Sequence, residues 1–231
     1  LQQTLFEKTI RKQPEASQLL SLQYRMAEEI MGFSNAAFYN NQLRAAANTM
    51  THFLIEGEQN MVFIDTAGSG FMEFKDKESL SICNKEEAGM ALHLLKGLLK
   101  RVGLRDKDNR IWEVGLIAPY SAQVRLLKDM VASDTEWLYL KQLENNLTIN
   151  TVDGFQGQER DIILISLTRS NVQGEIGFLA DSRRMNVALT RAKRKLIVLG
   201  DSATIGNNDF YQSFLNYVQE RNLYHSVYEF M

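Results

Sequence analysis

The sequence has few of the residues that build covalent cross-links and metal sites. It contains one cysteine, Cys83, so neither an intrachain disulfide nor a cysteine-based zinc site can form. Its three histidines, His52, His93 and His225, are far apart along the chain. Single histidines on helices or surfaces are commoner than ligands at such spacing, so we expect no metal site built by this chain.

Long apolar runs and a surplus of basic residues are missing as well. No stretch of about 18 apolar residues occurs, so we expect no membrane span, and the first residues do not resemble a secretory signal. The chain has 26 basic and 28 acidic residues and a net charge of −2, so it could bind a polyanion only through a local patch. We expect a monomer in the cytoplasm, or in the nucleus of a eukaryotic cell.

Proline is scarce, with two residues, whereas short apolar runs recur along the chain. These runs span residues 61–65, 114–118, 147–152, 161–167 and 195–200. Several are apolar throughout, which is typical of strands covered on both faces in a parallel sheet.

Helical patterns lie between the apolar runs. Asn84 and Glu87 resemble a capping box, and Ser121 can cap a second helix. Residues 84–102 place an apolar stripe on one helix face, formed by Ala88, Ala91, Leu95, Leu98 and Val102. A final helix carries a second stripe, formed by Phe210, Phe214, Tyr217 and Val218. The alternation predicts an α/β fold with a mostly parallel sheet flanked by helices on both faces. Ligands of such sheets gather at the carboxyl ends of strands, so we expect functional residues just after the apolar runs.

Two polar segments stand out, one just before a predicted helix and one at the end of a predicted strand. Tyr24 and Arg25 are adjacent in SLQYRMAEEI; an isolated pair of this kind is usually an interfacial tyrosine and a solvated arginine, but it can also offer an aromatic face and a phosphate-binding cation. In IAPYSAQV, Pro119 ends a strand and places Tyr120 and Gln123 at its carboxyl edge. This second segment by itself predicts a strand–turn–helix corner.

Two further segments are rich in glycine or in charge. INTVDGFQGQERDIILIS contains Gly154, Gly157 and Glu159 in a loop that could approach a ligand and accept a ribose hydrogen bond, or could be a solvated connection. Six of the thirteen residues from Arg183 to Lys195 are basic. The helical pattern places Arg184, Val187 and Arg191 near one face, with Asp181 and Ser182 as caps, so the arginines need anionic partners if the helix is partly buried.

Together these four segments resemble the superfamily 1 helicases. QYRM, APYSAQ, TVDGFQGQE and RRMNVALTRAK occur in the order of the motifs of the second RecA-like domain, and the resemblance runs from about residue 20 to 201. The branch that resembles it most contains the nonsense-mediated-decay RNA helicase, senataxin and related DNA helicases. The resemblance implies a RecA-like, P-loop NTPase-type fold over residues 1–231 as a single domain.

The resemblance also implies roles for particular residues in ATP hydrolysis. Arg25 would contact the γ-phosphate and Arg191 would be the arginine finger, so both would be catalytic. Tyr24 would stack on adenine and Glu159 would hold the ribose, with Gln156 and Gly157 in the same ATP-binding loop. A second set would lie towards single-stranded DNA or RNA: Pro119, Tyr120, Gln123, Thr151, Arg169 and Asn171.

One motif of an ATPase is missing from the sequence. No G-x-x-x-x-G-K-[ST] loop occurs in the 231 residues, and Gly68-Ser69-Gly70 reads as a turn. The family places this loop, and with it the Mg²⁺ of ATP, in an upstream RecA-like domain. Because the chain begins at Leu1 rather than methionine, we expect a fragment that shares ATP with that upstream domain and is inactive alone.

Two other functions remain open at the sequence level. The chain could be a non-catalytic nucleic-acid or protein binding module that keeps the helicase fold. It could also be an unrelated α/β nucleotide-binding enzyme, although such an enzyme would need its own phosphate loop. The residues do not decide between DNA and RNA, because single strands are bound through backbone and stacking contacts that both offer.

Overall fold

A six-stranded sheet in which all neighbouring strands are parallel forms the centre of the computed structural model, which describes residues 5–77, 79–138, 143 and 145–231. The strand order is β10-β3-β9-β8-β6-β7. The strands are β3 (Met61–Asp65), β6 (Val114–Ala118), β7 (Leu147–Thr151), β8 (Arg160–Ser166), β9 (Ala192–Gly200) and β10 (Tyr224–Ser226). Every apolar run predicted as a strand is therefore confirmed, and β10 is an addition that its short polar sequence did not signal.

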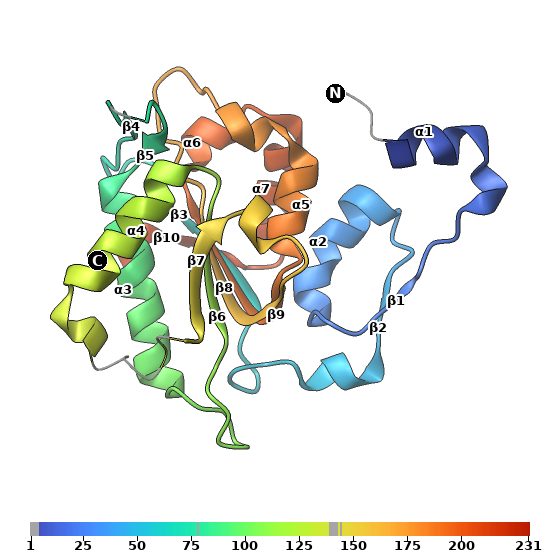
Figure 1. The fold of residues 1–231 in the computed structure, drawn as a ribbon, viewed down its shortest axis with the longest axis horizontal. Helices are drawn as coiled ribbons and strands as arrows, with labels where there is room; N and C mark the ends of the chain where they lie inside the picture. The colour runs from blue at the N-terminus through green and yellow to red at the C-terminus, as the bar shows by residue number, and fades with distance from the viewer. Residues whose placement is uncertain (1–4, 78, 139–142, 144) are drawn as a thin grey trace.

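Helices cover both faces of this sheet, which confirms the predicted fold class (Figure 1). On one face α3 (Lys85–Val102) and α4 (Ser121–Ser133) bury apolar side chains against β6, β8 and β9. On the other face lie α2 (Glu28–Tyr39), α5 (Ser182–Leu189) and α7 (Asp209–Glu220). Continuously apolar strands form where each face has its own core, because neither side of the sheet meets water.

The remaining elements are short and lie around this body. They are α1 (Leu5–Lys12), α6 (Ser202–Ile205), the parallel pair β1 (Leu22–Gln23) and β2 (Arg44–Ala45), and the antiparallel pair β4 (Phe74–Lys75) and β5 (Ile82–Cys83). The 3₁₀ helices are η1 (Pro14–Ala16), η2 (Ala47–Thr51), η3 (Thr135–Leu138), η5 (Asp153–Phe155), η6 (Gly177–Ala180) and η7 (Val227–Glu229). Residues 11–20 are exposed throughout, and α1 lies apart from the sheet in Figure 1.

The predicted helix caps are confirmed in part. The side chain of Asn84 accepts the backbone N–H of Glu87 at 3.0 Å, but the reciprocal half of a capping box is missing because the Asn84 N–H donates to Gln123 instead. The prediction for Ser121 is wrong. It is the first residue of α4, and Ser81 from the neighbouring loop accepts the Ala122 N–H at 3.2 Å in its place.

The connection from β7 to β8 passes over β6, because β6 lies between these two parallel strands. It takes the chain through residues 152–159 and buries Phe155 completely. Phe155 lies on Gly115 of β6, where an added Cβ would come within 2.9 Å of the phenylalanine ring and 2.5 Å of Ile163. The hydrogen side chain of Gly115 therefore lets the crossing segment, residues 152–159, lie directly on the sheet.

We predict that Gly115→Ala lowers the free energy of unfolding by about 1–3 kcal/mol, because the new methyl group overpacks this contact. Urea unfolding followed by circular dichroism measures the change. Gly97→Ala is the matched control, since an added Cβ at this helical glycine meets nothing within 4 Å. An unchanged stability in Gly115→Ala would show that the crossing segment does not depend on this close approach.

Candidate functional site

Three residues predicted to act on ATP meet at one place, although they come from distant parts of the sequence. Arg25 precedes α2, Glu159 ends the crossing segment, and Arg191 lies between α5 and β9. The Nε of Arg25 donates to Oε2 of Glu159 at 2.6 Å, and its Nη1 donates to the carbonyl of Thr190 at 3.3 Å. We call Arg25, Glu159 and Arg191 the arginine cluster.

Arg191 is held by backbone carbonyls rather than by a carboxylate. Its Nε donates to Val187 in the last turn of α5 at 2.9 Å, and its Nη1 donates to Gln158 at 3.1 Å. Burial lowers the pKa of the guanidinium, and the positive charge of Arg25 nearby lowers it further. Two like charges at such a place favour an anion between them, because each raises the cost of leaving the other uncompensated.

The backbone at Arg25 is fixed by two residues that the sequence analysis did not place in the site. The side-chain oxygen of Gln23 accepts the N–H groups of Arg25 and Met26 at 2.9 and 2.8 Å. The ring of His52 contacts the carbonyl of Arg25 through Nδ1 at 2.9 Å, and burial lowers the pKa of this histidine. The sequence carries no signal for Gln23 or His52, because the role of each depends on a contact, one across a turn and the other across 27 residues.

The other residues predicted to bind ATP lie close to the cluster along the chain and remain accessible. Tyr24 is 63% exposed, so its ring is free to stack on a base. Gln156 and Gly157 are both exposed in the crossing segment. Gly157 has a φ of 80°, a left-handed backbone conformation that glycine adopts at little cost.

A second group lies at the opposite, carboxyl edge of the sheet. Arg169 pairs with Glu73 at 2.8 Å and donates to the hydroxyl of Tyr120 at 3.2 Å. Asn171 donates to the same carboxylate at 3.1 Å. The structure thus brings three of the residues predicted to face nucleic acid around Glu73, but it buries the side chains of Tyr120 and Arg169.

Gln123 is buried more deeply still, with no exposed surface. Its amide nitrogen donates to Ser166 at 3.0 Å, and the hydroxyl of Ser166 donates to the buried carboxylate of Glu87. Glu87 also accepts the N–H of Thr168, which has a φ of 72°, one residue before Arg169. An outward-facing Gln123 therefore does not fit the structure; its hydrogen-bonding groups are used to fix the 166–171 turn. Pro119 and Thr151 are partly exposed at the same edge.

The expectation that all functional residues follow strands is wrong for the arginine cluster. Glu159 and Arg191 come directly before β8 and β9, so they lie at the amino edge of the sheet. Arg191 also lies beyond the end of α5 at Leu189, not on the helix face with Arg184; it reaches Val187 only through its side chain. The periodic pattern did not reveal that the helix stops two residues earlier.

Two other kinds of feature were considered for the described residues, a metal site and a membrane-spanning helix. No group of three or more histidine, cysteine, aspartate or glutamate side chains is arranged to hold a metal ion in the part of the chain that the structure describes. Among the same residues, no helix is long and apolar enough to cross a membrane.

Comparison with known proteins places the chain in a family. The profile of the AAA domain family matches residues 1–203, and the chain belongs to this family. Its relatives include an uncharacterized ATP-dependent helicase of Methanocaldococcus jannaschii, 37% identical over 95% of this chain. The DNA-binding protein SMUBP-2 of Mesocricetus auratus is 32% identical over all of it, and the DNA polymerase alpha-associated DNA helicase A of Saccharomyces cerevisiae is 33% identical over 95%.

The chain covers 32%, 23% and 33% of the lengths of these three relatives. It therefore corresponds to a third or less of each of them. Among solved structures, the C-terminal domain of a possible DNA helicase from Lactobacillus plantarum matches 88% of the chain at 13% identity and a TM-score of 0.43.

The buried carboxyl of Glu87 predicts a pH-dependent stability. Burial raises its pKa from the usual 4.5 to about 7. The pKa of Glu87 is higher in the folded than in the unfolded state, so its protonated carboxyl contributes fully to the free energy of unfolding below about pH 4.5. This contribution is lost as the pH rises through 7, and the loss is roughly 3 kcal/mol at most. Unfolding free energies measured from pH 5 to 8 should fall in the wild type relative to Glu87→Gln. Glu86→Gln, at the exposed neighbouring position, should keep the wild-type slope, and parallel curves for all three would contradict the assignment.

Proposed function

We propose that this chain is the second motor domain of an ATP-dependent helicase of superfamily 1 that moves along single-stranded DNA or RNA. The meeting of Arg25, Glu159 and Arg191 at one edge of the sheet carries this proposal. Residues from three separate helicase-like motifs lie together there, and the fold would not require them to meet unless they shared a ligand. The helicase names of two relatives support the same function.

The arginine cluster fits the chemistry of phosphoryl transfer. Transfer of the γ-phosphoryl group spreads negative charge over its oxygens, and an arginine that contacts them accelerates hydrolysis about 10³-fold or more. Arg191 suits this role, because three hydrogen bonds fix where its remaining N–H groups point: two to the carbonyls of Val187 and Gln158 and one to the hydroxyl of Thr190. The positive charge of Arg25 lies nearby. A fixed donor loses little entropy when the charge develops.

Arg25 suits a different role, because its present partner can be exchanged. The side chains of Arg25 and Glu159 are 35% and 43% exposed, so their ion pair is open to solvent. A phosphate that approached Arg25 would replace the carboxylate and free Glu159 to accept ribose hydroxyls. Tyr24, adjacent to Arg25, would stack on the adenine at the same time.

ATP would bring Mg²⁺ into this site, where the metal neutralises phosphate charge. The chain supplies cations at the arginine cluster, so we propose that the carboxylates for Mg²⁺ and the phosphate loop come from an upstream RecA-like domain. ATP would then lie between the two domains, and hydrolysis would depend on their closure.

The crossing segment offers a route from ATP to the nucleic acid. It follows Thr151, the last residue of β7 on the carboxyl edge, and ends at Glu159 on the amino edge. Pro119, Thr151 and the turn at Asn171 would line the strand, with Tyr120, Gln123 and Arg169 holding their backbone from inside. A shift of Glu159 on ATP binding would be carried along eight residues to that edge.

In the longer protein, we expect Arg191→Ala to reduce ATP hydrolysis at least about 10³-fold while nucleotide affinity changes little. Phosphate release and binding of a fluorescent ATP analogue measure the two quantities. Arg105→Ala is the control, since Arg105 bonds the carbonyl of Asn109 in its own loop. Turnover near the wild-type level in Arg191→Ala would refute the arginine-finger role.

The 231-residue chain by itself should release no phosphate from ATP above background, with or without single-stranded DNA or RNA. It lacks a phosphate-binding loop in its sequence, and Arg25 and Arg191 alone cannot position ATP. Adding the upstream domain in trans should restore hydrolysis that depends on nucleic acid. Turnover by the isolated chain would contradict a shared site, and a longer protein without turnover would favour a binding module.

A further inference from the structure

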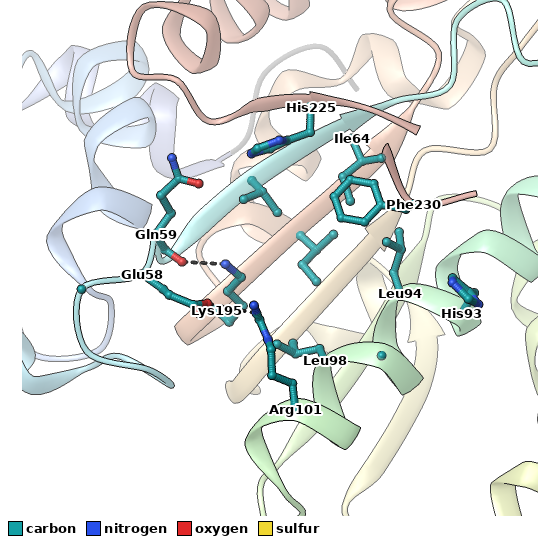
Figure 2. Close-up of a pocket in the computed structure, with 14 residues that line it drawn as sticks. Glu58, Gln59, Ile64, His93, Leu94, Leu98, Arg101, Lys195, His225 and Phe230 are labelled. Atoms are coloured by element: carbon teal, nitrogen blue, oxygen red, sulfur yellow. Dashed lines mark hydrogen bonds and ion pairs between the residues drawn. The ribbon is translucent and has the colours of Figure 1, made fainter. Parts of the chain in front are cut away.

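A cavity of about 620 Å³ lies on the sheet face that α3 only partly covers, between this helix, β3, β9 and β10 (Figure 2). Its apolar lining comes from Val62, Ile64, Leu94, Leu98, Ile197 and Phe230. None of the residues that line it belongs to the candidate site described above. Cavities of about 300–1,000 Å³ with mainly apolar walls and a few polar groups are typical of small-molecule sites.

Lys195, in the middle of β9, is the unusual residue of this cavity. It is 8% exposed, and its ammonium donates to the carbonyl of Gln59 at 2.6 Å. No carboxylate in the described part of the chain lies within ion-pair distance of it. Glu58, the nearest acidic side chain on the rim, pairs with Arg101 at 3.0 Å. A buried ammonium with one carbonyl partner keeps unused N–H donors and an uncompensated charge.

The two preceding residues of β9, unlike Lys195, have acidic partners. Lys193 lies 3.7 Å and Arg194 lies 3.3 Å from the buried carboxylate of Asp161, and Lys193 also pairs with Glu113. Lys195 alone of these three basic residues faces an open cavity rather than an acid. Burial lowers its pKa, and this loss of water outweighs the opposing effect of the more distant carboxylates of Glu58 and Glu29.

The cavity is also divided into two ends. Figure 2 shows Lys195, Gln59, Glu58 and Arg101 at one end. Ile64, Leu94 and Phe230 lie towards the other, where His93 and His225 are also found. A ligand that fits this arrangement has a negative head group and an apolar body. We propose that the cavity binds a small amphiphilic anion, with a carboxylate or phosphate on the ammonium of Lys195 and the apolar body on Ile64, Ile197 and Phe230.

Four probes with the same eight-carbon tail test this proposal: octanoate, octyl phosphate, octanol and octyltrimethylammonium. Titrations below micellar concentration, followed by methyl NMR shifts of Ile64 and Ile197, give both affinity and location. We expect one of the two anions to bind at least about tenfold more tightly than octanol, because a charge-assisted hydrogen bond is added, and the cation not to bind. The stronger of the two anions identifies the head group.

Lys195→Met should keep the fold, since it replaces a buried charge with an apolar side chain of similar length. It should reduce the preference for the anion over octanol to less than about twofold, since only the shared apolar tail remains. Lys100→Met, which removes an exposed charge from α3 at a position that does not line the cavity, should keep the preference. A preference that survives in Lys195→Met, or equal binding of all four probes to the wild type, would overturn the proposal.

Gly97→Leu keeps the test decisive if Lys195→Met does not fold. Gly97 lines the cavity on α3, an added Cβ there meets nothing within 4 Å, and leucine favours a helix. The new side chain should occupy part of the cavity and weaken binding of the anions and of octanol together. Anion binding of unchanged affinity would place the ligand elsewhere and contradict the proposal.

Discussion

The two candidate edges of this protein depend on one contact, that of Phe155 with Gly115. Strands β7 and β8 are parallel and separated by β6, so the chain must return along the whole sheet between them. Phe155 fixes this return by lying on β6 where the side chain is a hydrogen atom. Glu159 reaches the amino edge, and Thr151 remains at the carboxyl edge, because the segment between them is pressed onto the sheet.

The two edges of the sheet differ in how their charged side chains are paired and in how far they are exposed to water. At the carboxyl edge Glu73, Arg169 and Asn171 satisfy one another inside the protein, so their contribution is to hold a turn. At the amino edge Arg25 and Glu159 meet in partial contact with water, where an exposed ion pair contributes little to stability. The first arrangement is rigid, and the second can exchange partners at small cost, which suits a site that a polyanion enters and leaves.

The sequence predicted the strands and the grouping of the arginine cluster but not its edge. Apolar runs such as 161–167 identify strands because burial on both faces leaves a simple pattern, and the motifs name Arg25, Glu159 and Arg191 together. Whether a residue lies before or after a strand depends on where a helix ends, and Thr190 and Arg191 carry no periodic signal for that. Gln123 was misjudged for a related reason: a polar residue after a strand looks exposed until its partners Asn84 and Ser166 are known.

Arg191 closes the last turn of α5 with the same guanidinium that points to the candidate ATP site. A lysine there would keep the charge but not the planar fork that reaches Val187, Gln158 and Thr190 at once. The end of the helix and the proposed catalytic role would thus require the same side chain. Natural variation at this position should accordingly be narrower than at Arg25, whose side chain pairs with one half-exposed carboxylate and one backbone carbonyl.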